Sequence, residues 1–453
     1  MAVASQQELV ERIWSRDATV WTGGDEDKWL GWLDEPKRMQ ERIGELEEFA
    51  GKARTEFTTF VLLGMGGSSL APEVLKRTFG ARDLHVLDTT HPAMIRHAVE
   101  FLDLPKTMFI VSSKSGTTLE TLSHMDFFWD QTGGNGRQFV AITDPGSPLE
   151  SRARQRDFRA IFAGEPTIGG RYSALSPFGI VPAALMEIDI ARLLETAVRM
   201  ADDCRGDASP GLELGLRLGD NWREGRDKVC LTDTAGNFGL WAEQLIAEST
   251  GKQGKGLVPA PGESPDGPDR QPGDVQVVDP YAVGGEFFRW EFAVASAGSI
   301  LGVNVFDQPD VQAAKDKTKE LLASGEDPRL DPEGSLDRLL AQAEPPHYLA
   351  IQAFIDPMRE SDLRPLIERA RATGCVVTHG LGPRYLHSTG QLHKGGPPTG
   401  LFIQVVEDYG TDVPIPNQPF GFGQLIRAQA EGDFESLKEH GRKIVRVSLE
   451  EVT

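Results

Sequence analysis

The feature that most constrains this chain is an alternation, beginning near Thr58, of short apolar runs with segments of helical spacing. Such alternation is typical of a parallel sheet covered by helices on both faces, an α/β fold. Strands are expected at Phe60–Leu63, Leu84–Leu87, Met108–Val111, Phe139–Ile142 and Phe158–Ile161. Helices are expected at Ser69–Phe79, Ala93–Phe101, Thr117–Asp130, Leu149–Arg156 and Ile190–Met200.

A second alternating block starts near Lys228. It predicts strands at Val229–Leu231, Val275–Val278, Tyr348–Ala353, Val376–His379 and Leu401–Val406. It predicts helices at Leu240–Ser249, Phe287–Leu301, Val311–Ala323 and Leu363–Thr373. Two insertions interrupt this block. Pro259–Asp274 is crowded with Pro, Gly and Asp and is predicted to be a surface loop, and Ser324–His347 is acidic, contains Pro and is expected to be exposed. The end of the chain, Phe422–Thr453, is expected to hold a pair of helices and a strand-like run at Lys443–Leu449.

The length of 453 residues is too great for a single hydrophobic core. We expect a helical N-terminal segment (1–54), a first α/β domain (55–205), a second α/β domain (206–410) and a C-terminal helical segment (411–453). At 39% hydrophobic and 25% charged residues, the chain has the composition of an ordinary soluble globular protein.

The net charge of −21 argues against binding to nucleic acid or to an anionic membrane surface. A local cluster of cations and backbone N–H groups can still bind a small anion. Cys204, Cys230 and Cys375 form neither a metal-binding spacing nor a disulfide framework, which favours a reducing, cytoplasmic location. Met1–Arg12 lacks the pattern of a signal peptide, and no apolar stretch is long enough to span a bilayer.

Two polar stretches each lie between a predicted strand and a predicted helix. Gly64–Ser69 reads Gly-Met-Gly-Gly-Ser-Ser, which suits close backbone approach and anion binding, or only a strand–helix turn. Ser112–Thr121 carries the hydroxyls of Ser113, Ser115 and Thr118 beside Lys114. So many hydroxyls at a helix start favour a phosphate cradle over a merely capped helix.

Gln244 and Glu248 are four residues apart in a segment of helical character, so they lie on one face, a turn apart. Trp241 and Leu245 make the surroundings apolar, and burial raises a carboxyl pKa toward the range of a general base. The alternative is a solvated Glu near a helix end that is capped by Gly251.

Three further motifs carry candidate groups. Arg171 follows two glycines, where it could hold an oxyanion or simply sit in a surface turn. Gln308 and Lys315 are seven residues apart on one predicted helix face, although a solvated Lys is the commoner case. His387 and His393 are six residues apart with no nearby carboxylate, which favours acid–base or structural roles over a metal site.

Taken together, these stretches resemble the phosphoglucose isomerase family. The matching residues keep the family's order and are Gly66–Ser68, Ser113–Thr118, Gly169–Ser173, Gln244, Glu248–Lys252, Phe306–Gln308 and Lys315. The segment from Gly382 to Gln391 is similar to the isomerase half of bacterial bifunctional transaldolase/isomerase proteins. The transaldolase half is absent, so isomerase activity alone is expected.

The resemblance implies two sugar-isomerase (SIS-type) α/β domains that interconvert glucose 6-phosphate and fructose 6-phosphate, a step of glycolysis and gluconeogenesis. The reaction would pass through a cis-enediol, with no metal or cofactor. Glu248 would be the base, Arg171 would stabilise the enediolate oxygen, and Lys315 would serve ring opening. The substrate would be held by Gly67, Ser68, Ser113, Lys114, Ser115, Thr118, Gln244 and Gln308.

One departure concerns the ring-opening histidine, which longer family members carry between the base and the Gln/Lys pair. This chain has no His from Ser249 to Gln308. Lys315 with a water, His387 or His393 could do that work, and we favour His393 because it is expected in a loop before two glycines. In the family this histidine can come from the other subunit, which is compatible with a homodimer.

Two other functions share this fold. A non-catalytic sugar-phosphate sensor would need the phosphate cradle but not Glu248, Arg171 and Lys315. An isomerase that also accepts mannose 6-phosphate differs only in how its pocket treats carbon 2.

Overall fold

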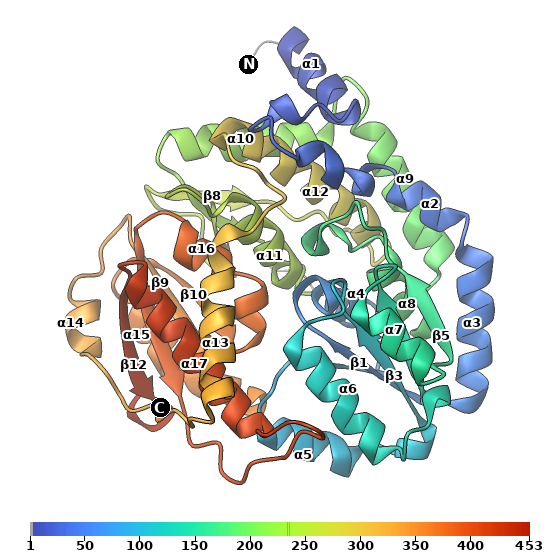
Figure 1. The fold of residues 1–453 in the computed structure, drawn as a ribbon. Helices are drawn as coiled ribbons and strands as arrows, with labels where there is room; N and C mark the ends of the chain where they lie inside the picture. Colours follow the sequence, from blue (N-terminus) through green and yellow to red (C-terminus); the bar gives the residue numbers. More distant parts are fainter. Residues whose placement is uncertain (1–2, 233, 235) are drawn as a thin grey trace.

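The N-terminal segment is helical, as predicted, and Figure 1 shows it in blue along the top and the right-hand side of the molecule. The structure is a computed structural model that describes residues 3–232, 234 and 236–453. The segment comprises α1 (Val3–Trp14), α2 (Glu35–Gln40) and α3 (Ile43–Glu56), with short 3-10 turns between α1 and α2. Trp32 is buried in this segment and its ring packs on Tyr172 and Phe288, which belong to different parts of the chain. The segment therefore ties both α/β blocks together.

The first block forms the parallel sheet that the sequence predicts. Its strands are β1 (Thr59–Gly64), β2 (Leu84–Leu87), β3 (Thr107–Ser112), β4 (Phe139–Thr143) and β5 (Ala160–Ala163), in the order β2-β1-β3-β4-β5. The helices between them are α4 (Leu70–Phe79), α5 (Pro92–Phe101), α6 (Leu119–Gln131) and α7 (Pro148–Gln155). Gly64 pairs with Ser112 in the register of β1 and β3, so the two glycine- and hydroxyl-rich loops emerge side by side.

The last strand of this sheet starts two residues later than predicted. The backbone N–H of Phe158 bonds to the carbonyl of Ala153 in the turn after α7, so Phe158 cannot join the ladder. Its ring is buried against Phe139 and Trp129 instead. Phe158 is thus apolar because its ring packs in the core, although it lies before the strand.

Four further helices contribute buried residues to one large hydrophobic core. They are α8 (Pro177–Leu185), α9 (Ile190–Asp203), α10 (Pro210–Arg223) and α12 (Ala282–Leu301). Nearly every residue of α12 is buried, and it contacts α9, α10 and α11 (Gly239–Thr250). The helix that carries the candidate base, α11, is thus held by a helix that is almost entirely buried.

The second block contains two parallel sheets where the sequence reading expected one. Three strands, β6 (Lys228–Leu231), β7 (Val258–Pro261) and β8 (Arg270–Gly273), form a sheet of order β7-β6-β8. Four strands, β9 (Tyr348–Phe354), β10 (Val376–Leu381), β11 (Gly400–Val406) and β12 (Lys443–Ser448), form a sheet of order β10-β9-β11-β12. The edge strands β7 and β10 are in contact.

Two expectations for the second block are wrong. The region Pro259–Asp274 is not simply a loop, because most of β7 and all of β8 lie within it. Both are edge strands, where Pro is tolerated, so their Pro content hid them from the sequence pattern. The strand expected at Val275–Val278 does not form, and Val278 is 90% exposed.

The C-terminal part holds one long helix instead of the expected pair. This is α17 (Phe422–Glu439), and the strand-like run after it is β12, which completes the four-stranded sheet. The remaining helices are α13 (Gln312–Ser324), α14 (Leu336–Leu340), α15 (Arg364–Arg371) and α16 (Gly390–Gly395). Figure 1 shows α13 and α17 side by side in front of this sheet, facing the first block across the molecule.

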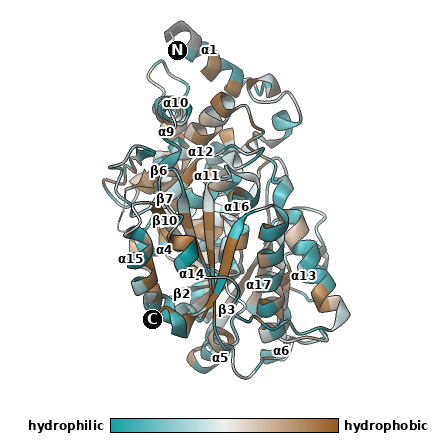
Figure 2. Ribbon diagram, turned by 90° about the vertical axis from the view of Figure 1, so that its left-hand side faces the viewer, coloured by the Kyte–Doolittle hydropathy of each residue, from teal (hydrophilic) through white to brown (hydrophobic). Residues whose placement is uncertain are grey.

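Hydropathy follows these layers. Figure 2 shows largely apolar, brown strands in the middle and teal residues along the outer helices. Within the described part of the chain, none of the helices combines the length and apolar character needed to cross a membrane. The architecture, parallel sheets flanked by helices with helical segments at both ends, is the α/β class predicted from the sequence.

Gly179 in α8 tests how tightly the large hydrophobic core is packed. A Cβ at this position would lie 1.9 Å from the backbone oxygen of Ala174, which cannot move aside like a flexible side chain. We expect Gly179→Ala to destabilise the protein by about 1–3 kcal/mol, through overpacking. Gly51→Ala in α3 is the control, because nothing lies within 4 Å of its added Cβ. The midpoint temperature of thermal unfolding should fall for Gly179→Ala and not for Gly51→Ala. Equal midpoints for the two variants would contradict the steric overlap at Gly179.

Candidate active site

The hydroxyl-rich loop after β3 folds into a cradle at the start of α6. Ser113 Oγ lies 3.0 Å from Thr118 Oγ1, and Ser115 Oγ lies 2.9 Å from Thr117 Oγ1. Thr118 is the N-cap residue of the 13-residue helix, in extended conformation. The free N–H groups of a helix start and several hydroxyls therefore face the same space, an arrangement that suits an anion.

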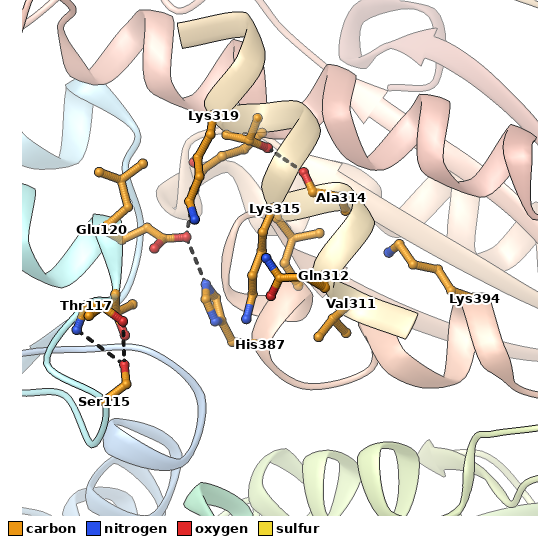
Figure 3. A pocket seen from close by; sticks show the side chains of 15 residues that line it. Ser115, Thr117, Glu120, Val311, Gln312, Ala314, Lys315, Lys319, His387 and Lys394 are labelled. Atoms are coloured by element: carbon orange, nitrogen blue, oxygen red, sulfur yellow. Dashed lines mark hydrogen bonds and ion pairs between the residues drawn. The ribbon is translucent and has the colours of Figure 1, made fainter. Parts of the chain in front are cut away.

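This cradle forms one wall of a cavity of about 230 Å³. The other walls come from α13 and from the segment that holds His387 (Figure 3). The cavity is lined by Ser115, Thr117, Thr118, Leu119, Glu120, Val311, Gln312, Ala314, Lys315, Thr318, Lys319, Leu386, His387, Lys394 and Gln429. Lys315 and His387 point toward one another across from the hydroxyls. Lys394 is paired with Asp433, so Lys315 and Lys319 face one carboxylate, Glu120, and the cavity is more cationic than the acidic chain as a whole.

Six residues predicted to bind substrate do not line this cavity; they are Gly67, Ser68, Ser113, Lys114, Gln244 and Gln308. The Lys114 ammonium pairs with Asp144 and also donates to the carbonyl of Glu165 at 3.1 Å, so it fixes the loop from behind. Gly67, Ser68 and Gln308 lie outside the lining as well. Ser113 reaches the cavity only through its contact with Thr118.

A second cluster surrounds the candidate base on α11. Glu248 Oε2 lies 3.1 Å from the Arg171 guanidinium and accepts a hydrogen bond from Gln244 Nε2 at 3.2 Å. Arg171 is 2% exposed and the Glu248 side chain 12%. The predicted one-turn spacing of Gln244 and Glu248 on a helix is confirmed, and it places carboxylate, amide and guanidinium in contact.

Two groups behind this cluster hold the arginine in place. Arg171 donates a hydrogen bond of 2.8 Å to the carbonyl of Asp307. The Lys252 ammonium donates to the carboxylate of Asp307 and the carbonyl of Asn304, both at 2.6 Å. Burial, and then the charge of Arg171, lower the pKa of Lys252 to about 7. Asp307, the residue before Gln308, is thus held by both Arg171 and Lys252.

Two glycines let the segments of the site approach one another. Gly66 has φ +55°, and a Cβ there would lie 2.6 Å from the carbonyl oxygen of His387. A Cβ at Gly67 would lie 2.0 Å from the carbonyl oxygen of Gly170, next to Arg171. Only glycine fits at either position, so the Gly64–Ser69 loop acts as the contact surface between the two blocks.

His387 connects the cluster around Glu248 to the cavity. Its carbonyl accepts a hydrogen bond of 2.8 Å from Gln244 Nε2, while its imidazole Nε2 lies 2.8 Å from Glu120 Oε1. Burial alone would raise the pKa of Glu120, but the charge and hydrogen bond of His387 outweigh it and lower it to about 2. Glu120 is therefore ionised and fixes the orientation of the imidazole.

His393, the residue favoured for ring opening, lies in the core and not in the cavity. It belongs to the short helix α16 and not to a loop. Its Nδ1 bonds to Gln352 Nε2 at 3.0 Å, and its ring packs between Tyr385 and Phe402. Burial lowers the pKa of His393 well below its usual value. The geometry therefore favours the alternative, His387.

Several groups of the site were not singled out from the sequence. Glu120, Lys319, Lys394 and Gln429 line the cavity, and Lys252 supports Arg171. Glu120 gave no distinguishing signal, because an acidic residue in the first turn of a helix is the ordinary case. Within the part of the chain that the structure describes, no three His, Cys, Asp or Glu side chains gather as a metal-binding group.

Comparison with known proteins supports the resemblance. Residues 29–208 match the family model of phosphoglucose isomerase. A glucose-6-phosphate isomerase of Gloeothece citriformis is 33% identical over 266 residues, which is 51% of this chain and 50% of that protein. One of Thermus thermophilus is 35% identical over 203 residues, 43% of this chain and 48% of that protein. The chain thus spans about half the length of the curated relatives it matches.

Solved structures share the fold. A glucose-6-phosphate isomerase from Chlamydia trachomatis aligns with a TM-score of 0.58 and 18% identity, covering 71% of this chain and 85% of that one. A hypothetical protein from Thermus thermophilus aligns with a TM-score of 0.51 and 22% identity, covering 98% and 83%. At such identities these structures show the fold alone. The resemblance to the phosphoglucose isomerase family is confirmed over the matched residues, whose range ends before Gly382.

The burial of His393 predicts a pH effect on stability. Its pKa is below 6.5 in the folded protein and near 6.5 in the unfolded chain, so acid protonates the unfolded state first. The contribution of neutral His393 to the free energy of unfolding is fully present above pH 6.5. It is lost as the pH falls, and the free energy of unfolding should drop by about 2 kcal/mol between pH 7 and 5. His393→Asn keeps an acceptor for Gln352 but cannot titrate. Unfolding midpoints measured from pH 7 to 5 should fall less steeply for the variant; parallel curves would contradict a neutral, buried His393.

Proposed function

We propose that this protein is an aldose–ketose isomerase that interconverts glucose 6-phosphate and fructose 6-phosphate through a cis-enediol. One observation carries the proposal. A carboxylate that is only 12% exposed, Glu248, contacts the guanidinium of Arg171 and is joined through Gln244 and His387 to a cationic cavity with a helix start in its wall. A base, an oxyanion partner and a phosphate cradle are the three parts that this reaction needs.

The phosphate would bind at the start of α6. Ser115, Thr117 and Thr118 supply hydroxyls there, and Lys315 supplies a charge from the opposite wall. Binding energy from this remote group would orient the sugar without taking part in the chemistry. Lys114 would act indirectly, by holding the cradle loop against Asp144.

Ring opening would fall to His387 and Lys315. The bond from carbon 1 to the ring oxygen breaks, the ring oxygen gains a proton, and the hydroxyl on carbon 1 loses one to become a carbonyl. Two polar groups close to the ring can do this. His387 and Lys315 both line the cavity, and Figure 3 shows the Lys315 side chain directed toward the imidazole. Glu120 would keep the imidazole in position.

The isomerisation step would fall to Glu248. The carboxylate takes the proton from carbon 2 of the open aldose, and the carbonyl oxygen on carbon 1 becomes an enediolate. Arg171 stabilises that charge while the hydroxyl proton on oxygen 2 passes to oxygen 1. Glu248 then returns its proton to carbon 1, and oxygen 2 becomes the carbonyl of the ketose. Gln244 holds the base through the bond to Glu248 Oε2 and would place it beside the substrate.

A sugar-phosphate sensor is the second candidate, and the cluster around Glu248 argues against it. A sensor gains nothing from a buried carboxylate that must be balanced by Arg171, since burying charge is costly. His387 reaches the cavity from this chain itself, so the proposed chemistry does not require a second copy. A homodimer, a cytoplasmic location, activity on mannose 6-phosphate and likeness to the bifunctional proteins remain predictions.

Replacing the base should abolish turnover. Glu248→Gln is expected to lower kcat by about 10²- to 10⁴-fold, because it removes the group that moves the proton. Glu243→Gln on the same helix is the matched control. Burial raises the pKa of Glu243 to about 7, so a neutral amide resembles its protonated form. The assay is conversion of fructose 6-phosphate by chelator-treated protein, coupled to detection of glucose 6-phosphate. Full activity of Glu248→Gln would remove it from the mechanism, and binding without turnover by the wild type would favour the sensor.

Weakening the cradle should affect binding more than chemistry. Thr118→Val removes one hydroxyl at the start of α6, and a lost bond to a charged group should raise KM about tenfold or more. The same change at Thr132, which caps the other end of α6, is the control. Affinity for the acyclic inhibitor sorbitol 6-phosphate, measured by calorimetry, should fall in step with KM. An unchanged affinity would place the phosphate elsewhere.

A further inference from the structure

The C-terminal helix α17 contributes a buried side chain to the cavity. Gln429 is 3% exposed and lines the cavity wall. Its Nε2 donates a hydrogen bond of 2.7 Å to Glu120 Oε1, and its Oε1 accepts one of 2.9 Å from the Thr90 hydroxyl. Both ends of the amide are satisfied, so its orientation is fixed. This amide connects the C-terminal helix to the loop after β2.

Gln429 and His387 bond to the same carboxylate oxygen. Both hydrogen bonds end on Glu120 Oε1, and Glu120 is itself 5% exposed. A buried carboxylate with one partner keeps freedom to rotate about its last torsion, whereas two donors on one oxygen fix it. The position of the His387 imidazole therefore depends on Gln429 as well as on Glu120.

The next turn of α17 holds the other side of the His387 segment. Asp433, four residues after Gln429, accepts a hydrogen bond of 2.6 Å from the Tyr385 hydroxyl and pairs with the Lys394 ammonium. Tyr385 and Lys394 lie on either side of His387 in the sequence. Residues one turn apart share a helix face. A single face of α17 therefore contacts Glu120, which bonds to the His387 imidazole, and the residues Tyr385 and Lys394 on either side of His387 in the sequence.

The same helix also fixes the opposite wall. A Cβ at Gly432 would lie 2.7 Å from Thr318 Oγ1, so α13 lies close against α17 at this glycine. Thr318 Oγ1 donates to the carbonyls of Ala314 and Ala428. Ala314 precedes Lys315, whose side chain is directed toward His387. The helix α17 thus sets the spacing between both groups assigned to ring opening.

We propose that Gln429 is a positioning residue for ring opening, acting through Glu120 on His387. This inference rests on the proposed function. Gln429 touches neither the phosphate cradle nor Glu248 in the described contacts, so its loss should slow the opening of the sugar ring and leave the proton transfer itself intact. The effect expected from losing such a supporting contact is about tenfold.

The experiment isolates ring opening from isomerisation. Opening and closing of the ring interconverts the α and β anomers of glucose 6-phosphate, which NMR magnetisation transfer measures directly. The exchange is followed in a Glu248→Gln background, where the proton transfer is blocked. Gln429→Met, similar in length but without hydrogen-bonding groups, is compared with Gln424→Met. Gln424 lies on the same helix and bonds to the carbonyl of Glu326, outside the cavity lining.

We expect enzyme-dependent anomer exchange to fall about tenfold in Gln429→Met and to stay unchanged in Gln424→Met. Thr90→Val removes only the hydroxyl that bonds to the Gln429 amide and should lower the rate of anomer exchange about threefold. This second variant tests the inference even where Gln429→Met does not fold. In the protein with Glu248 intact, kcat for the hexose phosphate should fall with little change in the affinity for sorbitol 6-phosphate.

Three results would overturn the inference. These are unchanged exchange in the Gln429 and Thr90 variants, an equal loss in Gln424→Met, and no exchange above the spontaneous rate in the Glu248→Gln background. A wild-type protein that does not convert glucose 6-phosphate at all refutes the proposed function itself, which separates the two failures.

Discussion

The proposed site depends on one residue that contacts both of its halves. His387 accepts a hydrogen bond on its carbonyl from Gln244 in the Glu248 cluster, and its imidazole bonds to Glu120 at the cavity. The contact is possible because Gly66 has no side chain where the His387 backbone passes. A backbone contact fixes distance more firmly than a pair of flexible side chains. The base and the phosphate cradle, although they come from different sheets, are therefore held at a set separation.

Electrostatics explain how an acidic chain can hold an anionic substrate. The net charge of −21 acts over long distances and is screened by salt, whereas the lysines of the cavity act at contact distance. The one carboxylate in the cavity wall is already bonded to His387 and Gln429. Its Oε1 is thus already hydrogen-bonded before a phosphate arrives. Long-range repulsion would slow the approach of substrate without preventing binding.

Much of the fold and part of the site could be predicted from the sequence, and the limits have physical causes. Helical spacing was enough to place Gln244 and Glu248 one turn apart, because i and i+4 neighbours are set by backbone geometry alone. The choice between His387 and His393 could not be made in this way. Both are histidines in one segment, and only tertiary packing decides which ring meets Glu120 and which meets Gln352.

Long or buried polar side chains account for the other differences. Lys114 has the reach to meet either a phosphate or Asp144, and the sequence does not say which. Gln429 hydrogen-bonds to Glu120 although the two residues are 309 positions apart in the chain. No local pattern can indicate such a contact. The strands β7 and β8 were hidden for a different reason, since each contains Pro and is recognisable only from its pairing with β6.

The distribution of the site along the chain has a consequence for how the fold could work. The cradle lies in the first block, the candidate base and Lys315 lie in the second, and α17 near the C-terminus fixes Glu120 of the first block. Neither block alone would contain both a phosphate cradle and a base. The first block by itself would resemble a phosphate-binding module whose Glu120 lacks both of its partners. Because removing partners from a buried carboxylate is costly, the docking of α17 and the assembly of the proposed site should be a single event.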